Sequence, residues 1–404
     1  MKTEESNHDT RANLAFEPLL RAHMPELDTI RGMAIFGVLF YHGFYWARDL
    51  SLYNYDRGPR YFLTLMAQGQ FGVNLFFVLS GFLITGILLD SRNRPDYYQR
   101  FYFRRALRIL PAYYLTLFLL IILKLTSVGF LLMSLAYSSN MSALFGITLS
   151  YPVLWSLSVE EHFYLIWPFA LRRMAPTKLL WILCVILVLS PVSRFFYYEL
   201  GTHTNMTRTG YGFFTWNQLD GLALGAIVAI LVRKPSWGRK QMLQFSIFMI
   251  ASAILLVLAV YPFGILTRRT AIGEALQCVP WNFAFVALLG LFLLIGSGPR
   301  KRLVAPAFMI FFGQISYGLY LYHLMAFMGY DWATRQINYN SRLTLTLWEQ
   351  AWLRMIIAGV GAIIIAYLSR RFFEAPFLRL KNRWPAPSVG SRAKADRYTT
   401  TAAD

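Results

Sequence analysis

The sequence is poor in charged residues, above all acidic ones, and in cysteine. Charged residues make up 15% of the 404 residues, while 56% are hydrophobic; soluble domains carry about 25% charged residues. So few charges could not cover the surface of a soluble enzyme or a DNA-binding domain. The two cysteines, Cys184 and Cys278, both lie inside apolar runs, so they indicate no disulfide framework. The usual classes of soluble protein are therefore excluded.

Signatures of several soluble chemistries are missing as well. The sequence has no histidine followed four positions later by aspartate, no Gly-x-Ser-x-Gly turn, no glycine-rich phosphate loop and no Cys/His cluster with metal-ligand spacing. We therefore expect neither a metal site nor a permanently bound cofactor.

What the sequence has is a series of apolar runs of about 20 residues, the length that crosses a bilayer as a helix. A weaker run over 129–148 is broken by the polar residues around Asn140. We predict an all-α, polytopic helical membrane bundle with ten transmembrane helices. The ten clear runs begin near Ile30, Gln70, Arg108, Val153, Lys178, Asn217, Gln241, Gly273, Phe308 and Ala351.

The basic residues, 39 against 20 acidic ones, predict the orientation, because cytoplasmic loops hold the excess of lysine and arginine. Ten spans and a cytoplasmic N-terminus put every large basic block on the cytoplasmic side, together with the C-terminus. Counting 129–148 as a span would move three of the five blocks outside, so we expect that segment to lie on or dip into the outer face. This placement explains the net charge of +19 without a nucleic-acid partner. The blocks are Arg92–Arg108, Arg172–Lys178, Arg233–Lys240, Arg300–Arg302 and the tail from Arg370.

The predicted domain organisation is a single membrane domain over residues 25–380. Residues 1–24 form a polar cytoplasmic segment without the features of a secretory signal, so we expect the first span to be retained. Residues 381–404, rich in proline, serine and threonine, are predicted to be a disordered cytoplasmic tail.

Three ionisable residues inside the predicted spans are candidates for function, because a charge in the bilayer is costly. At about 1.5 Å per helical residue, His42 lies roughly 18 Å, Glu160 roughly 20 Å and His323 roughly 22 Å above the cytoplasmic edge. Three separate spans thus bring titratable groups to one level. An imidazole with a carboxylate nearby can act as a general base; the alternative is that His42 is a packed aromatic bonded to a neighbour's backbone.

Arginines mark a path from the cytoplasm to this level. Arg31 and His42 are eleven residues apart, three helical turns plus about 20°, so they project from the same helical face. Arg105 and Arg108 are neighbours on one face at the cytoplasmic edge. Arginine binds phosphate bidentately, although an arginine pair at this edge also serves as a topological anchor.

Six motifs in order resemble the acyltransferase-3 family, polytopic membrane enzymes that move acyl groups, usually acetyl, from acyl-coenzyme A onto carbohydrates. The resemblance covers roughly residues 25–380. The motifs are Leu27-Asp28 to Gly32 with His42, Phe76 to Phe82 around Ser80-Gly81, Arg105-Ala-Leu-Arg108-Ile-Leu-Pro111, Trp155-Ser156 to Tyr164 around Glu160-Glu161-His162, Ile315 to His323 around Tyr317, and Phe373-Glu374-Ala-Pro376.

The resemblance implies a role for each matching residue. His42 would be the catalytic base or a transient acyl acceptor, with Glu160 orienting its imidazole, and Arg31, Arg105 and Arg108 would hold acyl-coenzyme A, the co-substrate. An acceptor glycan or glycolipid would arrive from the outer side, near Tyr211, Trp216 and Asn217. The remaining residues assigned to substrate contact are Asp28, Trp155, Ser156, Glu161, Tyr317 and His323.

The resemblance leaves several points open. It implies a bacterial inner-membrane protein among membrane lipids, but it does not identify the acceptor, the acyl chain length, or direct transfer as opposed to an acyl-histidine intermediate. His162 stands where the family usually has glutamine, and Gln218 where it often has arginine. The residues alone also permit a transporter or flippase that uses buried His and Glu for proton coupling; the absence of an inverted repeat argues against it.

Overall fold

The computed structural model describes residues 17–44, 57–203, 212–263, 270–338 and 347–380. Within these ranges the structure is helical and contains no strand. The elements in chain order are α2 (Pro25–Phe44), α3 (Arg57–Ala67), η2 (Gln68–Phe71), α4 (Gly72–Asp90), α5 (Tyr97–Ile122), α6 (Val128–Leu135), η3 (Ser139–Phe145), α7 (Leu154–Arg173), α8 (Pro176–His203), α10 (Thr215–Leu231), α11 (Arg239–Val260), η4 (Tyr261–Phe263), α12 (Ala271–Leu276), α13 (Val279–Gly296), η5 (Lys301–Val304), α14 (Ala307–Asn338), α15 (Leu347–Leu368), η6 (Ser369–Glu374) and α16 (Ala375–Leu380).

The helices have the length and composition of a membrane protein. Within the described ranges, seven helical stretches are long and apolar enough to cross a bilayer, and α10 is a shorter apolar helix. Each of the ten predicted runs contains a helix, which confirms the all-α class. The count of ten spans and the side of each terminus stay predictions. The predicted tail over 381–404 and most of the predicted N-terminal segment lie outside the described residues.

The segment over 129–148 forms no spanning helix, in agreement with the prediction. It folds into the eight-residue helix α6 and the short 3₁₀ helix η3. At about 1.5 Å per residue, α6 is roughly 12 Å long, less than half of the hydrocarbon core, which is about 30 Å thick.

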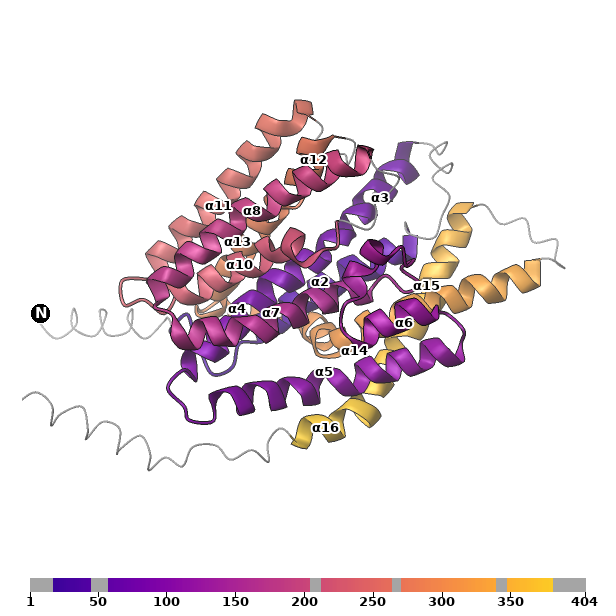
Figure 1. The fold of residues 1–404 in the computed structure, drawn as a ribbon, viewed down its shortest axis with the longest axis horizontal. Coiled ribbons are helices and arrows are strands. Elements are labelled where there is room, and N and C mark those ends of the chain that lie inside the picture. Colours follow the sequence, from indigo (N-terminus) through magenta and orange to yellow (C-terminus); the bar gives the residue numbers. More distant parts are fainter. Residues whose placement is uncertain (1–16, 45–56, 204–211, 264–269, 339–346, 381–404) are drawn as a thin grey trace, which may run out of the picture.

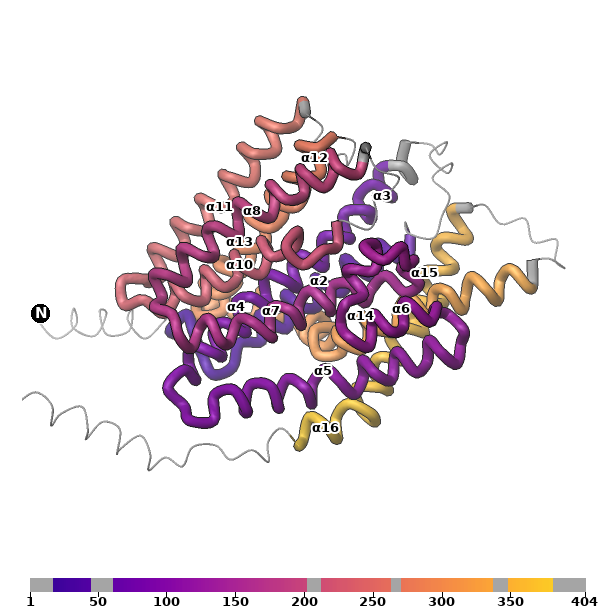
Figure 2. Tube along the Cα trace, in the orientation of Figure 1, coloured from indigo at the N-terminus to yellow at the C-terminus, as the bar shows by residue number. Residues whose placement is uncertain are grey.

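Helix α2 lies in the middle of the bundle, in contact with both α4 and α14 (Figure 1). Glycine permits the close approach to α14, because a Cβ on Gly32 would lie 2.4 Å from the carbonyl oxygen of Met309, and one on Gly313 would lie 2.0 Å from that of Asp28. In Figure 2 the early helix α2, in indigo, meets the much later α14, in orange, at the centre of the trace, and α4 packs against α2. The fold therefore brings motifs from distant parts of the sequence together around α2.

Helix α4 packs in the same manner against α10. A Cβ on Gly81 would lie 2.0 Å from the carbonyl oxygen of Leu222, and one on Gly225 would lie 1.9 Å from that of Val78. The pair Ser80-Gly81 is therefore a point of close helix contact of the small-residue kind. Helices α11 and α5 lie at opposite edges of the bundle (Figure 1), so the central helices are the ones that can enclose a site.

Candidate functional site

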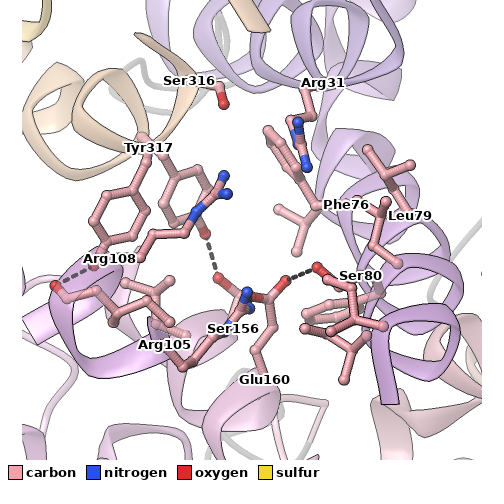
Figure 3. A pocket seen from close by; sticks show the side chains of 18 residues that line it. Arg31, Phe76, Leu79, Ser80, Arg105, Arg108, Ser156, Glu160, Ser316 and Tyr317 are labelled. Atoms are coloured by element: carbon pink, nitrogen blue, oxygen red, sulfur yellow. Dashed lines mark hydrogen bonds and ion pairs between the residues drawn. The ribbon is translucent and has the colours of Figure 1, made fainter. Parts of the chain in front are cut away.

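A cavity of about 150 Å³ lies among α2, α4, α5, α7 and α14. Three arginines line it: Arg31 from α2, and Arg105 and Arg108 from α5. Figure 3 shows Arg31 entering from one side of the hollow and Arg105 and Arg108 from the other. We call this space the basic cavity. The other polar residues of its lining are Ser80, Ser156, Glu160, Ser316, Tyr317 and Tyr320.

The arginines give the basic cavity an excess of positive charge. Arg31 pairs with Asp28, one helical turn earlier. The guanidinium of Arg105 lies 3.7 Å from the ring centroid of Tyr164 and 3.9 Å from the carboxylate of Glu160. Among the described residues no carboxylate lies within ion-pair distance of Arg108. Because the lining holds three guanidinium groups and one carboxylate, the cavity suits a bound anion, and phosphate fits the guanidinium fork best.

Glu160 belongs to this cavity and does not contact His42. Its carboxylate accepts a hydrogen bond of 2.9 Å from the hydroxyl of Ser80 and one of 2.7 Å from the hydroxyl of Tyr164. The expectation that Glu160 orients the imidazole of His42 is therefore wrong in its geometry. Glu160 instead ties α7 to α4 and stands beside Arg105.

His42 is oriented by a second histidine. Nδ1 of His323 lies 2.9 Å from the carbonyl oxygen of Leu319. Nε2 of His323 lies 3.2 Å from Nδ1 of His42. The same Nδ1 of His42 lies 2.9 Å from the carbonyl oxygen of Val38. A carbonyl only accepts, so Nδ1 of each ring carries the proton. In this arrangement the Nδ1–H of His42 faces two acceptors, and its Nε2 is the nitrogen that can take a proton.

A second cavity of about 150 Å³ contains His42, and we call it the outer cavity. It lies among α2, α4, α7, α10 and α12. The two cavities share Val73 and Tyr320 in their linings. The hydroxyl of Tyr320 lies 2.5 Å from Oγ of Ser156 and donates to the carbonyl of Val153 at 3.0 Å, so this ring stands between the two spaces. The other polar and aromatic residues of the outer cavity are Tyr41, Gln70, Phe71, Asn74, Trp155, Arg194, Phe213, Gln218, Glu274 and Gln277.

The remaining predicted residues divide between these places. Ser156 and Tyr317 line the basic cavity, and the hydroxyl of Tyr317 donates to the carbonyl of Ile109 at 2.9 Å. Trp155, the residue before Ser156, lines the outer cavity instead. Glu161 lines neither cavity.

The predicted acceptor contacts on the outer side lie elsewhere. Trp216 stacks near Tyr197, and Asn217 is buried and accepts a hydrogen bond from Ser193. Neither residue lines the basic cavity or the outer cavity. Tyr211 lies outside the described residues.

The two departures from the family pattern occupy different environments. Nδ1 of His162 lies 2.6 Å from the hydroxyl of Thr215, which accepts a hydrogen bond from Asn140, so His162 links α7 to α10. Gln218 lines the outer cavity and donates to the carbonyl of Gly212 at 2.6 Å.

Two ion pairs that involve buried arginines were missed from the sequence. Arg354 of α15 donates to the carbonyls of His42 and Gly43, at 2.7 and 2.6 Å, and pairs in a fork with Asp331 of α14. Arg194 of α8 pairs with Asp220 of α10 at 2.9 Å. Both arginines lie inside apolar runs. The criterion that selected His42 and Glu160, an ionisable residue within a predicted span, could therefore have found them.

A family model described as an acyltransferase domain matches residues 24–371 of the chain. The curated relatives include the peptidoglycan O-acetyltransferase OatA of Listeria monocytogenes, 27% identical, a putative peptidoglycan O-acetyltransferase, YrhL, of Bacillus subtilis, 29% identical, and a putative O-acetyltransferase of Staphylococcus aureus, 28% identical. Each alignment covers 88% of this chain and 55–57% of the relative, so the chain spans little more than half the length of these proteins. No solved structure matches.

Proposed function

Because the chain belongs to the acyltransferase-3 family, we propose that it is a membrane O-acetyltransferase that moves an acetyl group from acetyl-coenzyme A to a hydroxyl of a cell-surface carbohydrate. The observation that carries the proposal is the placement of the two cavities. A cavity with three arginines and a cavity with an oriented histidine meet at Val73 and Tyr320. The family match favours this enzyme over the proton-coupled transporter.

The donor would enter the basic cavity from the cytoplasm, in the inner membrane of a bacterium. Arg105 and Arg108 would bind the phosphates of coenzyme A, with Arg31 at the far side of the same cavity. Glu160 would keep Arg105 in place through their 3.9 Å contact. The thin pantetheine arm would then extend past Tyr320 and present its thioester to His42.

The transfer step uses His42 as a general base. Nε2 of His42 would take the proton of the acceptor hydroxyl while the oxygen of that hydroxyl bonds to the thioester carbonyl carbon. The carbon–sulfur bond then breaks, the imidazolium returns the proton to the departing thiolate, and coenzyme A leaves through the basic cavity. His323 would favour this step by accepting the Nδ1–H of His42 throughout.

The test is acetyl transfer by the purified full-length chain in lipid nanodiscs, with radiolabelled acetyl-coenzyme A and bacterial envelope glycan as acceptor. We expect His42→Ala to lower turnover by about 10² or more, because the general base is lost, while His23→Ala, which changes an exposed histidine, leaves it unchanged. Undiminished turnover of the His42→Ala variant would contradict the assignment of His42 as the general base.

Donor binding has its own measurement, titration calorimetry with coenzyme A. Arg108→Ala should weaken binding by about tenfold, because a charge-assisted hydrogen bond is worth about 1.5–3 kcal/mol. Arg302→Ala, which removes an exposed arginine outside both cavities, is the control. Equal affinities of the two variants would contradict the phosphate role of the basic cavity.

A further inference from the structure

We propose that the outer cavity is the acceptor site and that it takes an uncharged saccharide ring. The inference rests on the proposed function and extends it to the class of acceptor.

The lining of the outer cavity contains two aromatic rings as well as His42. The rings of Trp155 and Phe213 stack with centroids 4.6 Å apart and an angle of 23° between their planes, and both line the cavity. Each ring turns one face to the other, so the pair offers its remaining faces and edges to the apolar C–H face of a sugar ring. The amides of Gln277, Gln218 and Asn74 line the same space. Their nitrogens donate within the protein, to the carbonyls of Glu274 and Gly212 and to the side chain of Asn282. Their amide oxygens are hydrogen-bond acceptors of the kind that fix the orientation of a ligand.

The lining of the outer cavity also contains two charged side chains, Arg194 and Glu274. Arg194 does not offer its charge to a ligand, because its guanidinium donates to Asp220 at 2.9 Å and to the carbonyls of Asn217 and Ala275 at 2.6 and 2.9 Å. Glu274 also lines the cavity, and no described residue donates a hydrogen bond to its carboxylate. Glu274 also interacts electrostatically with Arg194, but Asp220 and Glu274 are two carboxylates against this single guanidinium. The charged groups at the outer cavity therefore sum to one negative charge, and the carboxylate of Glu274 can accept hydrogen bonds from sugar hydroxyls.

The two cavities thus carry net charges of opposite sign, and Tyr320 lies between them. The basic cavity holds three guanidinium groups and suits the phosphates of the donor, while Glu274 repels an anion from the outer cavity. An acidic sugar is therefore disfavoured there, and a neutral ring with a free hydroxyl is favoured. Because His42 lines this cavity, such a hydroxyl comes within reach of the base.

The charge argument is tested with two acceptors of equal size, N,N′-diacetylchitobiose and the disaccharide of glucuronic acid and N-acetylglucosamine. In the nanodisc assay the wild type should prefer the neutral disaccharide by about tenfold or more in kcat/KM. Glu274→Gln should remove most of this preference without changing the affinity for coenzyme A. The matched control is Glu17→Gln, which removes an exposed carboxylate outside both cavities.

A second measurement does not depend on turnover. Cys278 lines the outer cavity, so in a Cys184→Ser protein a small methanethiosulfonate reagent reports on access to it. We expect N,N′-diacetylchitobiose to slow the labelling of Cys278 at least threefold, and coenzyme A to leave it unchanged.

The outcomes separate this inference from the proposed function. If His42 and Arg108 variants behave as proposed, but Glu274→Gln keeps the wild-type preference or the saccharide gives no protection, the outer cavity is not the acceptor site. If the wild type transfers acetyl groups to acidic disaccharides as well as to neutral ones, the assignment of an uncharged ring is overturned. If no acetyl group leaves acetyl-coenzyme A with any acceptor, the proposed function itself fails.

Discussion

At the scale of single residues, the proposed chemistry depends on which nitrogen of His42 holds a proton. In many hydrolases a carboxylate fixes this choice and stabilises the imidazolium. Here the neighbour is His323, whose own Nδ1 is committed to the carbonyl of Leu319. A neutral imidazole can accept the Nδ1–H of His42 but does not neutralise an imidazolium. The structure therefore assigns His323 a positioning role.

Replacement of His323 should lower kcat and leave donor affinity unchanged. His323→Leu removes the acceptor at 3.2 Å from Nδ1 of His42 and leaves the carbonyl of Val38, at 2.9 Å, to keep the tautomer. Because the ring has then lost one of these two acceptors, its orientation is less fixed, and we expect a loss of about tenfold in kcat. His323→Gln, whose amide oxygen can accept the same proton, should retain more activity. The measurement is kcat beside calorimetric binding of coenzyme A; equal kcat values for the leucine variant and the wild type would exclude the positioning role.

At the scale of elements, the C-terminal end of α2 is held by the two helices around it. The last four carbonyls of a helix have no partner within it. In α2 the carbonyls of His42 and Gly43 accept hydrogen bonds from Nη1 of Arg354. Arg354 is 2% exposed and is itself held by Asp331. A positive charge at this end of a helix is favourable, so the ion pair ties α2, α14 and α15 together at the position of His42.

This arrangement predicts a separation of stability from activity. Arg354→Leu should lower the free energy of unfolding by about 3 kcal/mol, because it leaves the carboxylate of Asp331 unpaired. The double variant Arg354→Leu, Asp331→Leu should recover most of that stability, yet kcat should stay low because the end of α2 has lost its donors. Thermal unfolding and acetyl transfer on the same preparations test this; full activity in the double variant would contradict it.

The outcome for α2 and α7 shows what a sequence can predict and what it cannot. Depth follows from the rise per residue, so the sequence predicted that Arg31 lies at the cytoplasmic edge and His42 about three helical turns deeper on the same face. The structure places the two residues in successive cavities. Which neighbour a side chain faces depends on the rotation and packing of each helix, and spacing within one helix carries no such information. Glu160 was therefore expected beside His42, although its partners are Ser80 and Tyr164.

At the scale of the whole molecule, the position of the basic cavity has to agree with the orientation of the helices in the membrane. The arginines of this cavity belong to the first half of α2 and the first half of α5. Coenzyme A is a cytoplasmic compound, so the proposed function requires these helix starts to lie near the cytoplasm. The distribution of lysine and arginine along the chain predicts the same side independently.

Cysteine accessibility tests this orientation directly. Asn93, between α4 and α5, and Ala136, after α6, are both exposed, and the predicted topology puts them on opposite sides of the membrane. In a Cys184→Ser, Cys278→Ser background, a membrane-impermeant maleimide added to right-side-out vesicles should label Ala136→Cys at once and Asn93→Cys only after detergent is added. Labelling in the reverse order would place the basic cavity on the side without coenzyme A, and a donor bound at Arg105 and Arg108 could then not come from the cytoplasm.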